Sequence, residues 1–417
     1  MSEPLWKPSA ERIAKANISV FTRKLELDWD VSLPDYAALH AFSIEEIEKF
    51  WSSTWDFCGV IASEKGDRIL VDGEKMPGAQ FFPDARLNFA QNLLRRRDDT
   101  LAVLFRAEDQ IERQLTWREL YNETSRLTQA LRALGVEAGD RVAGFTPNCP
   151  EAIIAMLAVS SIGAIWTSCS PDFGVQGVLD RFGQVEPKVL FTADGYHYNG
   201  KPQDSLDKIA AALADLPSVQ LTVVFPLLED DPAIGDVPNS AHWRDLIAAH
   251  DPEVIDFAQL PFNHPLYILY SSGTTGAPKC IVHGAGGTLL QHLKEQQLHC
   301  NVKPGDRAFY FTTCGWMMWN WLVTFLASEA TVVLYDGSPS YPGPEVLFDY
   351  TDAVGINLFG TSAKFIDALG NIGLKPMETH KLSSLHTILS TGSPLVPEGF
   401  DYIYENIKKD VCLSSIA

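Results

Sequence analysis

A segment rich in glycine and in hydroxyl side chains is the part of this sequence whose residue types are best suited to a binding or catalytic role. It reads Ser-Ser-Gly-Thr-Thr-Gly-Ala-Pro-Lys at residues 271–279, directly after the apolar run 266–270. A polyphosphate needs backbone N–H groups that approach closely, which glycine permits because it has no Cβ, together with hydroxyl donors and a cation. The segment therefore predicts a phosphate-binding loop, with candidate ligands Ser271, Ser272, Gly273, Thr274, Thr275, Gly276 and Lys279.

The spacing within this loop separates it from the P-loop nucleoside triphosphatases. Those proteins carry G-x-x-x-x-G-K-[ST], in which lysine directly follows the last glycine. Here Ala277 and Pro278 stand between Gly276 and Lys279. A cluster of this composition behind a strand can also be an ordinary turn, and the residue types alone leave that alternative open.

The elements that must position the loop follow an alternating pattern. Capping boxes at residues 43–46 and 116–119 predict two helix starts; the first helix should run through Trp51, and Gly135 should end the second. The apolar stretch 152–166 is shorter than the ~20 residues that span a bilayer, so we expect a buried helix there. Strands are expected at residues 101–105, 141–145, 188–192, 221–225, 266–270, 308–311, 331–335, 355–359 and 387–390. Strands separated by helices predict an α/β fold with mostly parallel sheets covered on both faces.

Composition and charge narrow the class of protein. The 417 residues are 46% hydrophobic and 21% charged, as in globular proteins with two or three subdomains. A formal net charge of -20 argues against nonspecific binding to nucleic acid or to a membrane surface. The seven cysteines are scattered without a C-x-x-C pair, which favours buried, reduced thiols and a cytoplasmic location. His292, His299 and Cys300 fit no zinc spacing, so no metal site is predicted.

Residues 271–279 resemble the signature of the adenylate-forming, or AMP-binding, enzymes, which include acyl-CoA synthetases and luciferases. Other segments resemble one branch of that superfamily, the acetoacetyl-CoA synthetases: residues 35–43, 85–89, 163–174, 178–188 and 315–321. The resemblance implies an acid–thiol ligase that converts acetoacetate, ATP and CoA to acetoacetyl-CoA, AMP and pyrophosphate through an acyl-adenylate. It also implies that Mg²⁺ arrives with ATP, because no dedicated carboxylate cage is visible.

Roles for single residues follow from the same resemblance. Within the loop, Thr275 and Lys279 are the implied catalytic residues. Gly392, Ser393 and Pro394 match a Gly-Glu-Pro that lines the adenine pocket of acetyl-CoA synthetases, with serine in place of the glutamate. Trp316 and Met317 fall at the acyl pocket, whereas Trp319 and Trp321 are expected in the core. The implied CoA contacts are Tyr198, Asn199, Gly200, Lys201, Met318 and Ser340.

The resemblance also implies a domain organisation. Residues 1–95 match an acetyl-CoA-synthetase-type N-terminal module, and residues 96–417 match an adenylation domain that is incomplete at its C-terminal end, with the small C-terminal domain absent. We therefore expect a fragment that completes the reaction poorly on its own. Two alternatives remain open: an acetyl- or propionyl-CoA synthetase, and a non-catalytic nucleotide-binding module that ends at Ala417.

Overall fold

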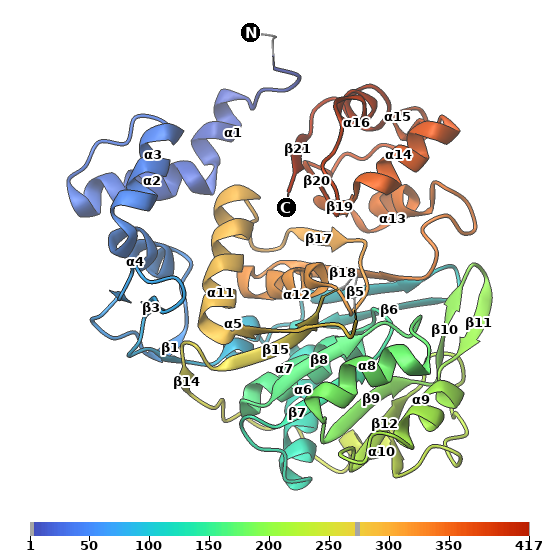
Figure 1. Ribbon diagram of the computed structural model, residues 1–417. Helices are drawn as coiled ribbons and strands as arrows, with labels where there is room; N and C mark the ends of the chain where they lie inside the picture. The colour runs from blue at the N-terminus through green and yellow to red at the C-terminus, as the bar shows by residue number, and fades with distance from the viewer. Residues whose placement is uncertain (1–3, 272–275, 417) are drawn as a thin grey trace.

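The computed structural model describes residues 4–271 and 276–416. Within those residues two seven-stranded sheets form the framework (Figure 1). The first sheet has the order β13 (Ser240–His242), β12 (Leu221–Phe225), β9 (Val189–Ala193), β7 (Arg141–Phe145), β8 (Ile165–Cys169), β15 (Pro265–Tyr270) and β16 (Cys280–Gly284). Its strands pair in parallel except β15 with β16.

The second sheet repeats this plan. Its order is β21 (Cys412–Ser415), β20 (Thr387–Thr391), β19 (Leu358–Ser362), β17 (Arg307–Tyr310), β18 (Thr331–Asp336), β5 (Leu101–Ala107) and β6 (Ile111–Thr116). Only the edge pair of β5 with β6 is antiparallel. The prediction of an α/β fold with mostly parallel sheets is confirmed.

Helices cover both faces of each sheet. The largest core cluster contains both inner sheet faces and the elements that pack between or beside them: α5 (Phe89–Leu93), α6 (Trp117–Ala133), α7 (Pro150–Ile162), α10 (Trp243–Ala248), α11 (Ala285–Leu293), α12 (Met317–Val323) and the 3₁₀ helix η2 (Thr324–Ser328). The outer face of the first sheet packs on α8 (Val175–Val185) and α9 (Leu206–Leu213). The outer face of the second packs on α13 (Val346–Val354), α14 (Ala363–Ile372) and the π-helix η3 (Ile403–Ile407), near α15 (Pro376–Thr379) and α16 (Pro397–Tyr402).

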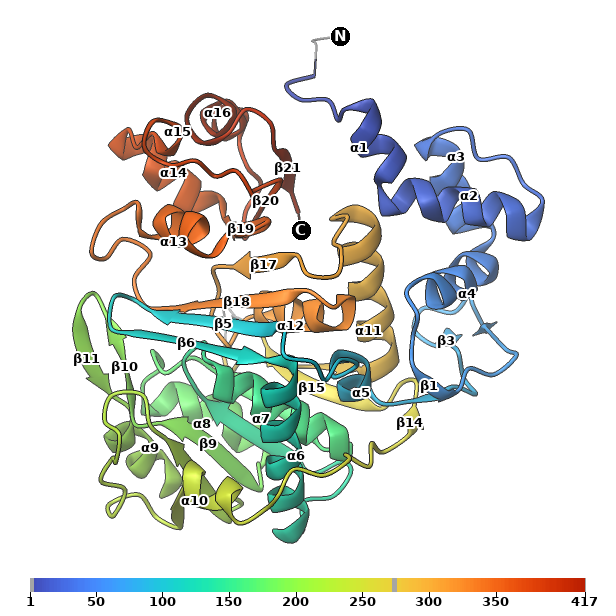
Figure 2. The ribbon, with the colours of Figure 1, turned by 180° about the vertical axis from the view of Figure 1, so that it is seen from behind.

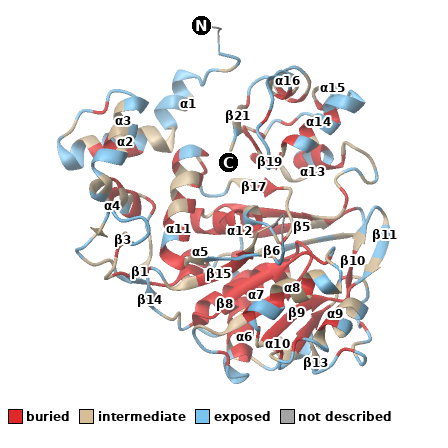
Figure 3. Ribbon diagram, viewed as in Figure 1, coloured by how far each residue is buried: buried red, intermediate tan, exposed pale blue. Residues whose placement is uncertain are grey.

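Strand alternation explains this layering. In β7, Val142 belongs to the large inner cluster, whereas its neighbour Ala143 belongs to the cluster beneath α8 and α9. Successive side chains of a strand point to opposite faces, so a strand buried on both faces must be apolar throughout. Figure 3 shows this as continuous buried colour along the central strands.

Four N-terminal helices and several short strand pairs complete the fold. The helices are α1 (Ala10–Lys15), α2 (Asn17–Trp29), α3 (Tyr36–Glu45) and α4 (Ile47–Phe57). They and helices α13–α16 stand on opposite sides of α11, as Figure 2 shows from behind. One short sheet has three strands, in the order β1 (Ala62–Glu64), β4 (Arg86–Leu87) and β14 (Leu260–Pro261). Two others have two strands each: β2 (Leu70–Val71) with β3 (Gln80–Phe81), and β10 (Gly195–Tyr198) with β11 (Lys201–Asp204).

Several local predictions are confirmed and others are wrong. The capping box of Thr116 and Glu119 is present, whereas Ser43 lies inside α3 and donates to the His40 carbonyl at 2.7 Å, because Asp35 caps that helix earlier. The helix expected over 152–166 ends at Gly163, where φ is 89°, and Trp166 belongs to β8. The strand expected at 355–359 begins only at Leu358. Strands β6, β8, β10, β11, β13, β16 and β21, and the short strands β1–β4 and β14, were not predicted.

Five of the seven cysteines are buried and none is in a disulfide. Across the described ranges, no helix is long and apolar enough to cross a membrane.

Candidate functional site

The topology of the second sheet indicates where a ligand should bind. Strand β17 lies between β18 and β19, so the chain leaves β17 toward one neighbour and later returns to the other. Ligands of open α/β sheets bind outside the carboxyl ends of the strands at such a switch point, because the loops there diverge. The carboxyl end of β17 is Tyr310, and that of β19 is Ser362.

A cavity of about 980 Å³ lies at this place. Its wall comes from the ends of β17, β19, β20 and β21, from the start of α12, and from the π-helix η1 (Lys294–His299) that continues α11. The lining residues are Lys294, Glu295, His299, Cys300, Tyr310, Phe311, Thr312, Thr313, Trp316, Met317, Met318, Trp321, Thr361, Ser362, Thr391, Gly392, Ser414 and Ile416. Segments more than a hundred residues apart in sequence therefore share one site.

The acyl-pocket candidates both line this cavity. Trp316 is 58% exposed and Met317 is 41% exposed, so neither belongs to the core and both present apolar surface to a ligand. Met318, predicted to contact CoA, lines the same cavity. Trp319 and Trp321 are 0% and 2% exposed, which confirms that they are core residues.

The π-helix η1 adds charged and polar groups to this apolar wall. A π-helical turn shifts the faces of a helix and is frequent at functional sites. Glu295 is already held, since Trp321 Nε1 donates to its Oε2 at 3.0 Å and Gln291 Nε2 donates to its Oε1 at 2.7 Å. Although His299 is exposed, partial desolvation of its ring lowers its pKa, with a smaller contribution from Lys294, so the imidazole is mainly neutral near pH 7. A neutral imidazole can donate one N–H to a ligand oxygen. No pattern in the sequence indicated this role of His299, because an α-helical period does not predict a π-helical turn.

One buried hydroxyl of the cavity wall lacks a partner. Thr361 is 1% exposed, and among the described residues nothing hydrogen-bonds to its Oγ1. A buried polar group without a partner costs stability unless a ligand or water satisfies it.

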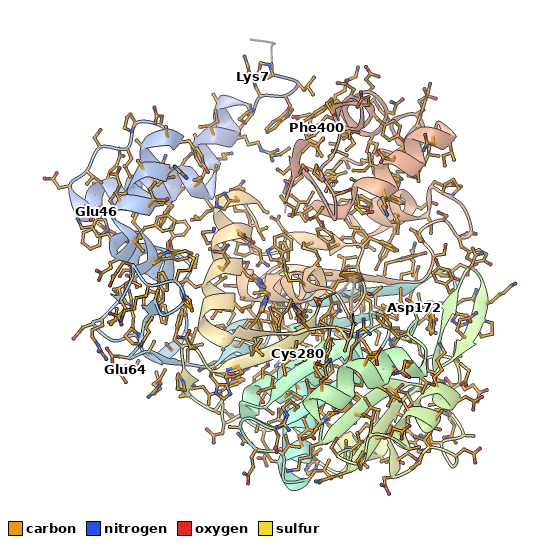
Figure 4. All side chains as sticks on the ribbon, viewed as in Figure 1. Lys7, Glu46, Glu64, Asp172, Cys280 and Phe400 are labelled. Carbon is orange, nitrogen blue, oxygen red and sulfur yellow. The ribbon has the colours of Figure 1, made fainter. Side chains whose placement is uncertain are left out.

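Strands β15 and β16 pair antiparallel, and the phosphate-loop candidates lie between them in the sequence. Ser271 N donates to the Lys279 carbonyl at 3.0 Å, and Lys279 N donates to Ser271 Oγ at 3.0 Å, which closes the base of the loop. Gly276 has φ of 102°, a conformation that glycine favours. Ser272, Gly273, Thr274 and Thr275 lie outside the described residues. Figure 4 labels Cys280, the residue after Lys279, near the middle of the molecule in that view.

The adenine candidates follow β20. Gly392 lines the cavity with φ of 87°, and Ser393 and Pro394 follow it as exposed residues. Leu395 N donates to Ser415 Oγ at 3.2 Å, which ties this turn to β21 at the cavity edge.

The remaining CoA candidates gather at a second place. Tyr198, Asn199, Gly200 and Lys201 are the turn of the β10–β11 hairpin, and Ser340 lies in the exposed loop after β18. The two segments are neighbours because the Glu108 carboxylate accepts hydrogen bonds from Asn199, Gly200 and Ser338. An Asn-Gly pair between strand-like residues is a hairpin signal that the sequence carried and that our prediction did not use. Asp172, also labelled in Figure 4, lies toward this hairpin.

Asn148 connects the first sheet to the loop that carries Trp316. This residue is 1% exposed and follows β7. Its Oδ1 accepts from Trp319 Nε1 at 3.0 Å, and its Nδ2 donates to the carbonyls of Thr312 at 3.4 Å and Tyr335 at 3.3 Å. The sequence offered no sign of this role, since the partners lie more than 160 residues away.

Asp336 anchors the backbone of that same asparagine. Its Oδ1 accepts from Asn148 N at 2.8 Å, and burial, with smaller contributions from Asp172 and Glu108, raises the pKa of its carboxyl to about 7. In the unfolded chain the carboxyl titrates near 3.8. Between these values the folded state binds more protons, so the carboxyl makes the fold less stable as pH rises from about 4 to about 7.

We expect the Asp336→Asn variant to remove this pH dependence. Asparagine keeps the Oδ1 acceptor and cannot ionise, so its free energy of unfolding relative to the unmodified protein should rise between pH 5 and pH 8 by roughly 2 kcal/mol. Urea unfolding at the two pH values measures this, with the exposed Asp401→Asn as the control. An equal difference at both pH values would contradict the raised pKa of Asp336.

Metal ligands are not evident in this part of the molecule. In residues 4–271 and 276–416, no group of three or more His, Cys, Asp or Glu side chains is arranged to hold an ion. His292, one of the residues considered at first, is buried and its Nδ1 lies 2.9 Å from Thr324 Oγ1.

Comparisons with known proteins match this chain almost throughout. The family model described as AMP-binding enzyme matches residues 89–409, and that described as acetyl-coenzyme A synthetase N-terminus matches residues 36–93. Acetoacetyl-coenzyme A synthetase of Rhizobium meliloti is 53% identical over 99% of this chain and 63% of its own length. Malonamoyl-CoA synthetase of Penicillium aethiopicum is 40% identical over 100% of this chain and 61% of its own. The solved structure of acetoacetyl-CoA synthetase from Streptomyces lividans superposes with a TM-score of 0.94 at 42% identity, covering 100% of this chain and 64% of that one. The chain thus spans less than two thirds of the length of these relatives.

Proposed function

Because the chain belongs to the AMP-binding enzyme family, we propose that the protein is an acid–thiol ligase that joins acetoacetate to CoA with ATP. The observation that carries this proposal is the cavity at the switch point of the second sheet. Its lining combines the exposed apolar side chains of Trp316 and Met317 with polar groups of η1 and of the strand ends. A small acid needs an apolar wall and a few directed polar groups of this kind.

The polar side of the cavity lining, which includes Lys294, Glu295 and His299 of η1, favours an acid that carries a second carbonyl. Acetoacetate has a ketone at C3, and malonamate, the acid of the relative from Penicillium aethiopicum, has an amide carbonyl at the same carbon. The neutral His299 imidazole is a donor suited to such an oxygen. Acetate and propionate have no C3 carbonyl and would leave this donor without a partner on the acid.

In the first step a carboxylate oxygen of acetoacetate attacks the α-phosphorus of ATP. A new O–P bond forms while the bond to pyrophosphate breaks, giving the acyl-adenylate. The loop closed by Ser271 and Lys279 is proposed to hold the departing phosphates, with Thr275 and Lys279 contacting the reacting groups. Gly392, Ser393 and Pro394 are proposed to border the adenine. Mg²⁺, entering with ATP, would neutralise part of the phosphate charge.

In the second step the CoA sulfur attacks the acyl carbonyl carbon. The C–S bond forms, the bond from that carbon to the AMP oxygen breaks, and the thiol proton leaves to solvent. Met318 lines the cavity and is proposed to meet the thiol end of CoA. Tyr198, Asn199, Gly200, Lys201 and Ser340 are proposed to border the nucleotide end.

Acid-dependent exchange of pyrophosphate into ATP tests this function on the native-length polypeptide. Acetoacetate should support exchange, and acetoacetyl-CoA should form when CoA is added. Butyrate, which has the same carbon chain without the ketone, should support exchange about tenfold less well, because it cannot accept a hydrogen bond from His299 at C3. Preference for acetate or propionate would favour those synthetases instead, and absence of any acid-dependent exchange would favour a non-catalytic module.

A variant of His299 tests whether this residue recognises the C3 carbonyl. The His299→Leu variant should use acetoacetate less well and butyrate about as well as the unmodified protein does. Butyrate is the internal control for correct folding. Loss of both substrates in equal measure would argue against recognition of the C3 carbonyl by His299.

A further inference from the structure

We propose that Glu108 is a positioning residue that shapes the site for the nucleotide end of CoA. The proposal rests on the proposed function, because it takes the β10–β11 turn and the loop around Ser340 as that site. Glu108 acts by holding these two segments together through its carboxylate.

The Glu108 carboxylate is bound by backbone groups from both segments. Oε1 accepts from Asn199 N at 2.6 Å and from Ser338 N at 2.8 Å, and Oε2 accepts from Gly200 N at 2.8 Å. The side chain is 1% exposed. A buried carboxylate requires such donors, and hydrogen bonds to a charged group are stronger than neutral ones.

The turn conformation aims both of its N–H groups at Glu108. Asn199 and Gly200 have φ of 57° and 74°, as in a two-residue type I′ hairpin turn. Because these N–H groups are donated inward, they are not free to bind a phosphate. A ligand at this turn must then be bound by side chains, above all those of Lys201 and Tyr198. Tyr198 is 49% exposed.

Close packing leaves the turn little freedom to shift. A Cβ on Gly200 would lie 2.5 Å from Cζ of Tyr341, so only glycine lets the turn rest on this ring. A Cβ on Gly337 would lie 2.3 Å from Cγ of Glu108, and Gly337 has φ of 114°. The two glycines therefore permit the carboxylate to enter between the segments.

The hairpin depends on such an anchor because it is small. Strands β10 and β11 pair only with each other, within the described residues, and an isolated two-stranded hairpin is marginally stable. Glu108 is fixed in turn, since its N–H donates to the Asp336 carbonyl at 3.1 Å in the second sheet. Glu108 thereby connects the β10–β11 hairpin to the second sheet.

The test compares two thiols in the native-length protein. Pantetheine carries the thiol arm of CoA without the nucleotide. In the Glu108→Gln variant, one acceptor oxygen becomes an NH₂ group that faces backbone N–H groups. We expect kcat/KM for CoA to fall about 10- to 100-fold, while kcat/KM for pantetheine and acetoacetate-dependent pyrophosphate exchange change by less than about twofold.

The matched control is Asp109→Asn. It removes the carboxylate of the exposed residue that follows Glu108 between β5 and β6, and it should leave the ratio of kcat/KM for CoA to kcat/KM for pantetheine unchanged. In the Glu108→Gln background, Lys201→Ala should cause little further loss, because its site is already displaced. Equal losses with CoA and pantetheine, or a matching loss of exchange, would overturn the role of Glu108. Absence of acetoacetate-dependent exchange in the unmodified protein would instead refute the proposed function.

Discussion

Replacing Lys279 with alanine is expected to lower acetoacetate-dependent pyrophosphate exchange by about 100-fold, the usual cost of removing one group that stabilises transition-state charge. The side chain is exposed, and the loop base is closed by the backbone N–H of Lys279 and by Ser271, which alanine at position 279 preserves. The free energy of unfolding should therefore change by less than about 0.5 kcal/mol. Exchange rates at saturating acetoacetate, together with urea unfolding, measure the two effects.

Two further variants make this experiment specific. Lys279→Arg keeps the charge and should recover part of the exchange activity. Lys375→Ala removes an exposed lysine that pairs with Glu378 and should change neither quantity. Normal exchange in Lys279→Ala would refute the assignment of Lys279 to the phosphate loop, whereas an equal loss of stability would make the role structural.

Replacing Asn148 with alanine is expected to destabilise the protein by about 3 kcal/mol and to impair substrate use at the same time. The variant leaves Trp319 Nε1, a donor on a fully buried side chain, without its acceptor. It also removes the donor that reaches the carbonyls of Thr312 and Tyr335. Because Thr312 and Trp316 line the cavity, the acyl pocket should loosen and exchange activity should fall about tenfold.

The comparison variant is Asn406→Ala, which removes a partly buried amide that makes one hydrogen bond, to the Tyr402 carbonyl. It should cost about 1 kcal/mol and leave exchange unchanged. Urea unfolding and exchange at low temperature, where both variants remain folded, provide the data. An Asn148→Ala protein with normal stability would show that the bridge between the sheets is not needed to order this loop.

Local sequence patterns predicted nine of the fourteen strands of the two large sheets, since strands with continuous apolar runs carry a strong signal. The runs at 141–145 and 221–225 match β7 and β12 residue for residue. The errors fall where local signals compete. Ser43 looked like a helix cap, but Asp35 starts the helix eight residues earlier, and the buried stretch 152–166 hid the boundary between α7 and β8.

Glycine spacing and residue type are local signals, and they were sufficient to predict the fold class, the candidate phosphate loop and the apolar residues of the candidate acyl pocket. Which distant groups meet could not be predicted in this way. In the folded chain, one cavity is lined by Trp316, Met317, His299, Thr361 and Gly392. The fold also places the Glu108 carboxylate against the backbone of the 198–201 turn. Such contacts depend on strand order and crossover direction, which join the carboxyl ends of strands remote in sequence. No local sequence pattern encodes that order. The polar lining of the cavity and the contact of Glu108 with the β10–β11 turn could therefore be identified only from the folded structure.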